Sequence, residues 1–195
     1  MSSVPTTTSA GGANTGFVIL ISCVATIGGL LFGYDSGAVN GTQPGLQSAF
    51  ALDDAGLGFT VGSLLIGCVI GAFFAGTLAD RMGRRNVMRL AAILFVIGAL
   101  VQGFAHEHAL FVFARILGGV AVGAASVLSP AYISEVAPAA IRGRMTTAQQ
   151  IMIITGLTLA FVVNYYLAAA AGSSTAAFWG GIEAWRWMYL MQAIP

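Results

Sequence analysis

A chain of 195 residues in which 57% of the side chains are hydrophobic and only 8% are charged cannot cover a water-facing surface with polar groups, because soluble domains carry about 25% charged residues. The composition excludes an ordinary soluble domain and favours a protein of the lipid bilayer. The formal net charge of +1 gives no reason to expect a nucleic-acid partner.

The first segment, residues 1–16, is rich in Ser, Thr, Gly and Ala and contains no basic residue. A secretory signal peptide carries a positively charged region before its apolar stretch. This segment is therefore predicted to be a disordered cytoplasmic tail, and the apolar stretch that follows to be a retained helix.

Five apolar segments are long enough to cross a bilayer, since a spanning helix needs about 20 mostly apolar residues. We expect helices near residues 17–40, 57–79, 87–105, 110–133 and 145–170, and the start of a sixth at 184. Residues 184–195 reach only about 18 Å as a helix, whereas the hydrocarbon core is about 30 Å thick. The sixth helix is thus expected to be incomplete, and the chain to be part of a longer protein that contains the rest of this helix and a second half.

Arginine placement predicts the orientation, because cytoplasmic loops are enriched in basic residues. The arginines cluster after the second and fourth segments, at Arg81, Arg84, Arg85, Arg89, Arg142 and Arg144. The alternate loops carry mainly acidic residues. We therefore expect a multi-pass protein of the cell membrane (the inner membrane in a Gram-negative bacterium) with a cytoplasmic N-terminus.

Glycine patterns indicate an internal repeat. Residues 28–33 and 118–123 both spell G-G-x-x-x-G, one in the first segment and one in the fourth. These segments correspond to each other in a 3+3 inverted repeat. The second segment also carries regularly spaced glycines, which favour either a moving interface or plain helix packing: Gly58, Gly62, Gly67, Gly71 and Gly76.

Two charges lie within apolar segments, where a charge is costly and indicates function. Asp35 follows the first G-G-x-x-x-G element and Arg115 precedes the second. The small residues allow the two helices to approach closely, so we expect the carboxylate and the guanidinium to meet. They would form either a proton switch, in which the carboxylate gains and loses a proton as the pair separates, or a static ion pair.

Further charges lie in the loops that we expect to be cytoplasmic. The first loop holds Asp80, Arg84 and Arg85 in the pattern G-x-x-x-D-R-x-G-R-R. In the second, Glu135 and Arg142 are close enough in sequence to pair as a latch on the cytoplasmic gate.

Gln149 and Gln150 enter the fifth segment. A buried amide both donates and accepts hydrogen bonds, which suits a polyhydroxylated ligand, although such a pair also serves helix packing. The sequence contains no nucleophile–base constellation, metal-ligand set or phosphate-cradling loop, so we expect neither an enzyme nor a cofactor or metal site.

Together these elements resemble the major facilitator superfamily, and within it the sugar porter family. Residues 76–85 are similar to the superfamily's loop motif, and the stretches more specific to sugar porters are 28–35, 115–119, 130–144 with Gln150, and 185–188. The resemblance covers everything after the tail. It implies an all-α membrane protein, the N-terminal six-helix half of a major facilitator fold built as a 3+3 inverted repeat.

The resemblance also implies roles for individual residues. Asp35 matches the acid that accepts the proton in proton-coupled members, Arg115 matches its partner, and Gln150 matches a glutamine that binds the sugar. The charged loop residues match a cytoplasmic network that stabilises the outward-facing state: Asp80, Arg84, Arg85, Glu135 and Arg142. Leu157 stands where some members have a second glutamine, which leaves the choice of sugar open.

The expected function is sugar transport by proton symport with alternating access. Its partners would be a sugar, the proton, the lipid bilayer and a C-terminal half in the same or a separate chain. The alternatives are a carrier of another polyol or small organic solute, a sugar sensor that does not transport, and an inert truncated half.

Overall fold

The computed structural model describes residues 15–137 and 139–194. Within them six α-helices follow one another: α1 (Thr15–Phe50), α2 (Asp54–Met82), α3 (Arg84–Phe104), α4 (His108–Val136), α5 (Ala139–Ala171) and α6 (Ala184–Leu190). Short 3-10 turns flank the last helix, η1 (Trp179–Gly181) before it and η2 (Met191–Ala193) after it. The predicted all-helical class is confirmed, whereas the predicted tail lies almost entirely outside the described residues.

Several helices are longer than hydropathy indicates. α1 continues to Phe50 rather than ending near residue 40, and it contains Pro44. The extension is packed against other helices, because Leu46 is fully buried in a cluster with Phe111 and Trp185. α5 likewise begins at residue 139 rather than 145.

Among the described residues, four helices have the length and apolar composition that a membrane span requires. They are α2, α3, α4 as far as Glu135, and α5 from Ile141. Many of their large apolar side chains are exposed, including Phe73 at 78% and Val69 at 70%. Such surfaces are expected where helices face lipid or other protein rather than water.

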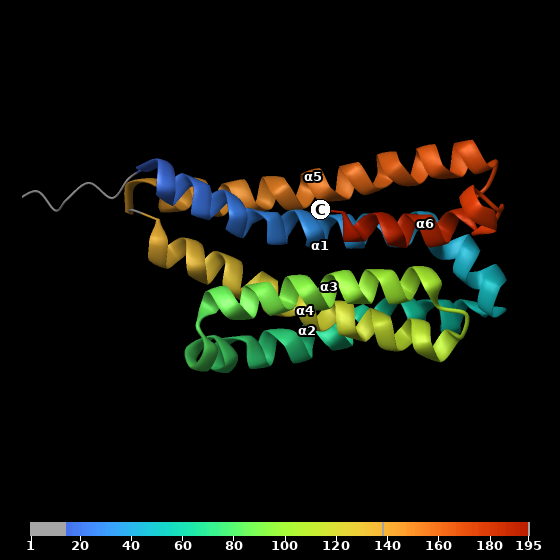
Figure 1. Ribbon diagram of the computed structural model, residues 1–195, viewed down its shortest axis with the longest axis horizontal. Helices are drawn as coiled ribbons and strands as arrows, with labels where there is room; N and C mark the ends of the chain where they lie inside the picture. Colours follow the sequence, from blue (N-terminus) through green and yellow to red (C-terminus); the bar gives the residue numbers. More distant parts are fainter. Residues whose placement is uncertain (1–14, 138, 195) are drawn as a thin grey trace, which may run out of the picture.

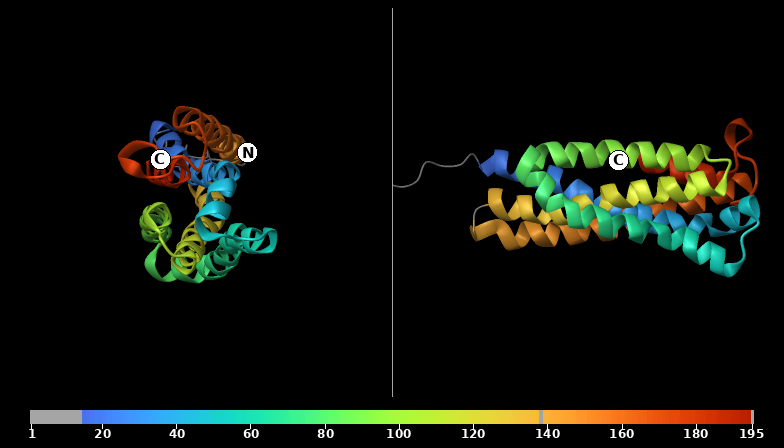
Figure 2. Two further views of the ribbon diagram at one scale, coloured as in Figure 1. Left: turned by 90° about the vertical axis from the view of Figure 1, so that its right-hand side faces the viewer. Right: turned by 90° about the horizontal axis from the view of Figure 1, so that it is seen from below.

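The helices run alongside one another in two groups of three (Figures 1 and 2). One group contains α1, α5 and α6, and the other contains α4, α2 and α3. Each group therefore joins the first helix of one predicted three-helix repeat to the last two helices of the other. The grouping treats the two repeats alike, as the pseudo-two-fold symmetry of an inverted repeat requires.

Several glycines line the seam between α1 and α5, and two of them show how closely the backbones approach. A Cβ atom added to Gly33 would overlap the carbonyl oxygen of Ile153, and one added to Gly156 would overlap that of Leu30. Only a glycine allows the backbones to approach this closely. A glycine of each helix thus packs directly against a backbone carbonyl of the other helix.

The α2–α4 seam repeats this arrangement. A Cβ atom on Gly123 would overlap the carbonyl oxygen of Cys68, and one on Gly71 would overlap that of Val120. Gly33 and Gly123 occupy the same place in the two G-G-x-x-x-G elements. On each of the four helices, the glycine lies three residues after the residue whose carbonyl oxygen meets the partner helix's glycine. The repeated glycine pattern in the sequence therefore corresponds to a repeated contact in the structure.

Candidate functional site

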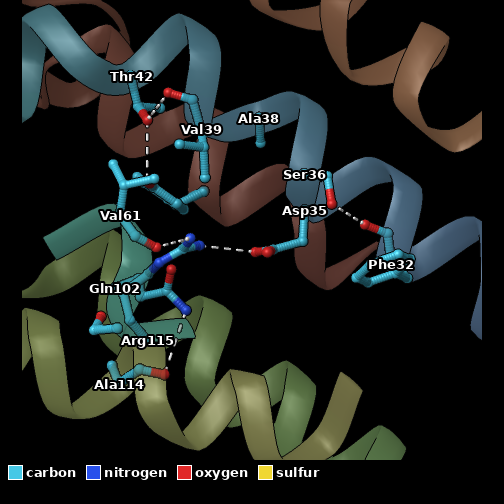
Figure 3. Close-up of polar contacts among 12 residues, drawn as sticks. Phe32, Asp35, Ser36, Ala38, Val39, Thr42, Val61, Gln102, Ala114 and Arg115 are labelled. Carbon is cyan, nitrogen blue, oxygen red and sulfur yellow. Dashed lines mark hydrogen bonds and ion pairs between the residues drawn. The ribbon is translucent and has the colours of Figure 1, made fainter. Parts of the chain in front are cut away.

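The two charges predicted within the membrane segments meet in the structure. Arg115 Nη1 donates a hydrogen bond to Asp35 Oδ1 at 3.0 Å, and each side chain is only 1% exposed. Asp35 comes from α1 and Arg115 from α4 (Figure 3). Because these helices belong to different groups of three, the buried ion pair links the two groups.

Neighbouring helices hold the guanidinium from other sides. Arg115 Nη2 donates to the carbonyl oxygen of Val61 on α2 at 3.4 Å, and the guanidinium carbon lies 5.9 Å from the centre of the Tyr189 ring on α6. The Tyr189 hydroxyl is 3.0 Å from the hydroxyl of Thr42 on α1. The arginine therefore keeps a carbonyl and an aromatic face close to it in addition to the carboxylate, and both interactions favour a cation.

Two polar atoms of the pair are buried without a hydrogen-bond partner among the described residues. They are Asp35 Oδ2 and Arg115 Nε. A free carboxylate oxygen can accept a proton without first breaking the bond that Oδ1 makes with the arginine. The geometry therefore suits a carboxylate that changes its protonation state. A structural ion pair in which both carboxylate oxygens accept hydrogen bonds would leave no oxygen free for the proton.

The predicted cytoplasmic charges are only partly brought together. Arg84 Nη2 lies 2.6 Å from Glu135 Oε1, with the two side chains 31% and 51% exposed. Glu135 thus pairs with Arg84 rather than with Arg142, whose Nη2 donates to the carbonyl oxygen of Ala137 at 3.5 Å. Such exposed pairs contribute only about 0–1 kcal/mol, so this contact can form and break readily.

The turn between α2 and α3 places Arg84 there. Gly83 adopts a φ of 82° and its N–H donates to the carbonyl oxygen of Ala79, which ends α2 and lets α3 begin at Arg84.

Asp80 and Arg85 are exposed and form no ion pair within the part of the chain that the structure describes.

The structure separates the two candidate sugar-binding glutamines. Gln149 is 7% exposed and its side chain faces Gly29 in the α1–α5 seam. Gln150 is exposed on α5. Gln149 therefore fits helix packing, and Gln150 is the one with an amide free to contact a ligand.

Three contributors to the site were not predicted from the sequence: Val61, Tyr189 and Thr42. Val61 contributes only its carbonyl, which carries no signal in the sequence. Tyr189 directly follows the motif of residues 185–188. That motif is the available signal in the sequence, but it does not indicate that Tyr189 lies beside Arg115.

Arg186 of the same motif ties α6 to α3. Its Nη1 donates to the carbonyl oxygens of Gly103 and Ala105, and its Nε lies 3.2 Å from Glu183 Oε2. The cation thus satisfies carbonyls at the C-terminal end of α3. This contact positions α6, and with it Tyr189, beside the ion pair.

Residues 21–195 match the family model described as "Sugar (and other) transporter". The chain belongs to the sugar transporter family. This family consists of carriers rather than enzymes, and the chain is accordingly a multi-pass membrane protein, as the composition predicts.

Several relatives match nearly the whole of this chain with part of their own sequence. The chain is 46% identical over 184 residues to a glucose transport protein of Synechocystis sp., covering 94% of this chain and 39% of that protein. It is 39% identical over 180 residues to the arabinose-proton symporter of Bacillus subtilis, covering 92% and 38%. With the D-xylose-proton symporter of Escherichia coli strain K12 the identity is 37% over 211 residues, covering 93% and 42%. The chain spans about two fifths of the length of these curated relatives.

Solved structures show the same fold. A proton:xylose symporter of the major facilitator superfamily bound to 6-bromo-6-deoxy-D-glucose superposes with a TM-score of 0.84 at 38% identity, covering 93% of this chain and 43% of that chain. The inward-open xylose transporter of E. coli gives a TM-score of 0.81 at 39% identity, covering 91% and 45%. The six helices therefore correspond to the N-terminal half of a major facilitator sugar transporter, which confirms the predicted fold.

Proposed function

We propose that this sugar transporter family member takes part in sugar uptake by proton symport, with Asp35 as the proton acceptor and Arg115 as its partner. The buried ion pair between α1 and α4 carries the proposal. Charged side chains inside a membrane protein are costly and therefore rare, and those that are present usually mark a functional site. Two of the named relatives, an arabinose-proton and a D-xylose-proton symporter, couple sugar to protons by their names.

The pair provides a physical route for coupling. A proton that enters from the outside adds to Asp35 Oδ2, the free oxygen, and removes the negative charge. The attraction across the boundary between the two helix groups then weakens, because a neutral carboxyl no longer complements the guanidinium. In alternating access, this loosening allows α1 and α4 to move relative to one another and release the sugar and proton inside.

The sugar contact is assigned to Gln150. Its exposed amide offers a donor and an acceptor to sugar hydroxyls, and the relatives' names specify glucose, arabinose and D-xylose. A pentose or hexose is therefore the proposed substrate class, with a C-terminal half, in the same or a separate chain, supplying the rest of the site. Leu157 has an apolar side chain that packs against Gly37 of α1, so this position adds no polar group to the proposed sugar site.

The charged loops are proposed to form the cytoplasmic gate. The Arg84–Glu135 pair would be its closed contact, with Asp80, Arg85 and Arg142 completing the network when a second half docks. This assignment requires the N-terminus to be cytoplasmic in the cell membrane, as the arginine distribution favours.

Asp35→Asn tests the proposal in cells that express the protein. Asparagine cannot take up a proton, so we expect uphill accumulation of labelled sugar to be lost while exchange of internal for external sugar continues. Accumulation at the level of the unmodified protein would exclude Asp35 as the coupling group.

A further inference from the structure

Gln102 is a buried amide within the apolar helix α3. Its side chain is 2% exposed, and its Nε2 lies 3.5 Å from the carbonyl oxygen of Ala114, the residue before Arg115. Its Oε1 has no hydrogen-bond partner among the residues that the structure describes. A buried amide oxygen without a partner is costly, so its presence here requires an explanation.

The unpaired atom of Gln102 complements an unpaired atom of Arg115. The arginine uses Nη1 for Asp35 and Nη2 for Val61. Within the described part of the chain, its Nε donor is buried without a partner. Figure 3 shows the Gln102 amide oxygen turned toward the Arg115 side chain. The free acceptor is thus turned toward a side chain that is always charged and that carries a free donor.

We propose that Gln102 is a positioning residue that holds the Arg115 guanidinium through Nε when Asp35 takes up its proton. This inference rests on the proposed role of Asp35 in proton uptake. The proton adds to Asp35 Oδ2, and Arg115 keeps its charge. The cation is then held by the carbonyl of Val61, the ring of Tyr189 and the oxygen of Gln102.

This role gives Gln102 an effect on protonation that a packing residue lacks. A buried guanidinium whose carboxylate has been neutralised loses its main partner, and this loss opposes protonation. An acceptor that compensates the cation reduces that loss and favours the protonated state. The other titratable groups near the pair are Tyr189 from α6 and Cys68 from α2, and both are ordinarily uncharged near neutral pH.

The test follows protonation of Asp35 directly in the purified protein in lipid. Infrared difference spectra record the carboxyl C=O band against pH, and each variant is compared with the same variant carrying Asp35→Asn. Gln102→Met removes the acceptor while keeping a similar length and volume. Gln102→Glu keeps an oxygen of the same reach, and Leu100→Met, on the exposed face of α3, controls for a change in that helix.

We expect Gln102→Met to move the midpoint of the Asp35 band to lower pH by about one unit or more, the effect of losing a hydrogen bond to a charged group. Gln102→Glu and Leu100→Met should not move it to lower pH. An unchanged midpoint in Gln102→Met, or an equal fall in Gln102→Glu, would overturn the proposal. The measurement does not depend on transport, so a protein that moves no sugar would contradict the proposed function without affecting this result.

Discussion

At the scale of single residues, the stability of the Asp35–Arg115 pair depends on both partners being present. Each side chain is 1% exposed, so neither charge is compensated by water. Burying a charge costs several kcal/mol, which only a well-placed opposite charge offsets. A variant without one partner leaves an uncompensated charge, whereas a variant without both leaves none.

Arg115→Met should therefore be less stable than the double variant with Asp35→Asn. We expect the single variant to lose about 3–5 kcal/mol of the free energy of unfolding, and the second substitution to recover most of this loss. Thermal unfolding of the purified proteins in detergent at alkaline pH measures the difference. A double variant no more stable than Arg115→Met would contradict the account of two mutually compensating charges.

Gln150→Ala should weaken sugar binding by about 1–3 kcal/mol, because a sugar hydroxyl that loses its protein partner is left unsatisfied. Gln149→Leu should leave the affinity unchanged, since that side chain lies in the α1–α5 seam. Equilibrium binding of labelled sugar compares the two. An unaltered affinity in Gln150→Ala would return this residue to the packing interpretation.

The sequence predicts some of these contacts better than others. The meeting of Asp35 and Arg115 was predictable because a charge in an apolar segment must find a partner. The partner of Glu135 was not, since several arginines share the same loops and an unpaired surface arginine costs little. The free oxygen of Gln102 was also beyond prediction, because a single amide in an apolar segment gives no sign of its orientation.

At the scale of helices, the regularly spaced glycines of α2 fall into two classes, those that meet the backbone of α4 and those that meet no other residue among those described. Among these glycines, Gly67 and Gly71 lie against α4. An added Cβ atom at Gly58, Gly62 or Gly76 would meet nothing within 4 Å in the described part of the chain. The glycine spacing thus predicts a packing face on α2. Of the five glycines named from the sequence, two contact α4.

Gly71→Ala and Gly62→Ala should have opposite effects on stability. The first places a methyl group against the backbone of Val120, and overpacking of this kind costs about 1–3 kcal/mol or more. The second fills open space and should stabilise the helix by roughly 0.5–1 kcal/mol, as alanine does in place of an interior helical glycine. Thermal unfolding midpoints of the two variants provide the measurement, and equal midpoints would rule out the seam as the cause.

The end of α1 shows why helix boundaries were harder to predict than helix existence. Residues 41–50 contain polar side chains and Pro44, so hydropathy places the end near residue 40. The helix continues because Gly45 lies against Trp185 and Leu46 is fully buried. This packing partner is more than 100 residues away in the sequence, where no local pattern can indicate it.

At the scale of the whole molecule, the proposed proton site lies between the two groups of helices. The Asp35–Arg115 pair joins α1 to α4, one helix from each group. The glycine seams lie within the groups, one between α1 and α5 and the other between α2 and α4. Because each seam is rigid at backbone contact, relative motion is expected between the groups rather than within them. The proposed proton switch therefore sits on the boundary that alternating access would have to change.

The most direct test is the movement of protons with sugar. De-energised cells that express the protein are held in a weakly buffered medium, and D-glucose, L-arabinose and D-xylose are added in turn while the external pH is recorded. The account predicts that the transported sugar makes the medium more alkaline, and that Asp35→Asn abolishes this change. Sugar entry without any change in external pH would contradict proton symport and leave the buried pair as a structural feature.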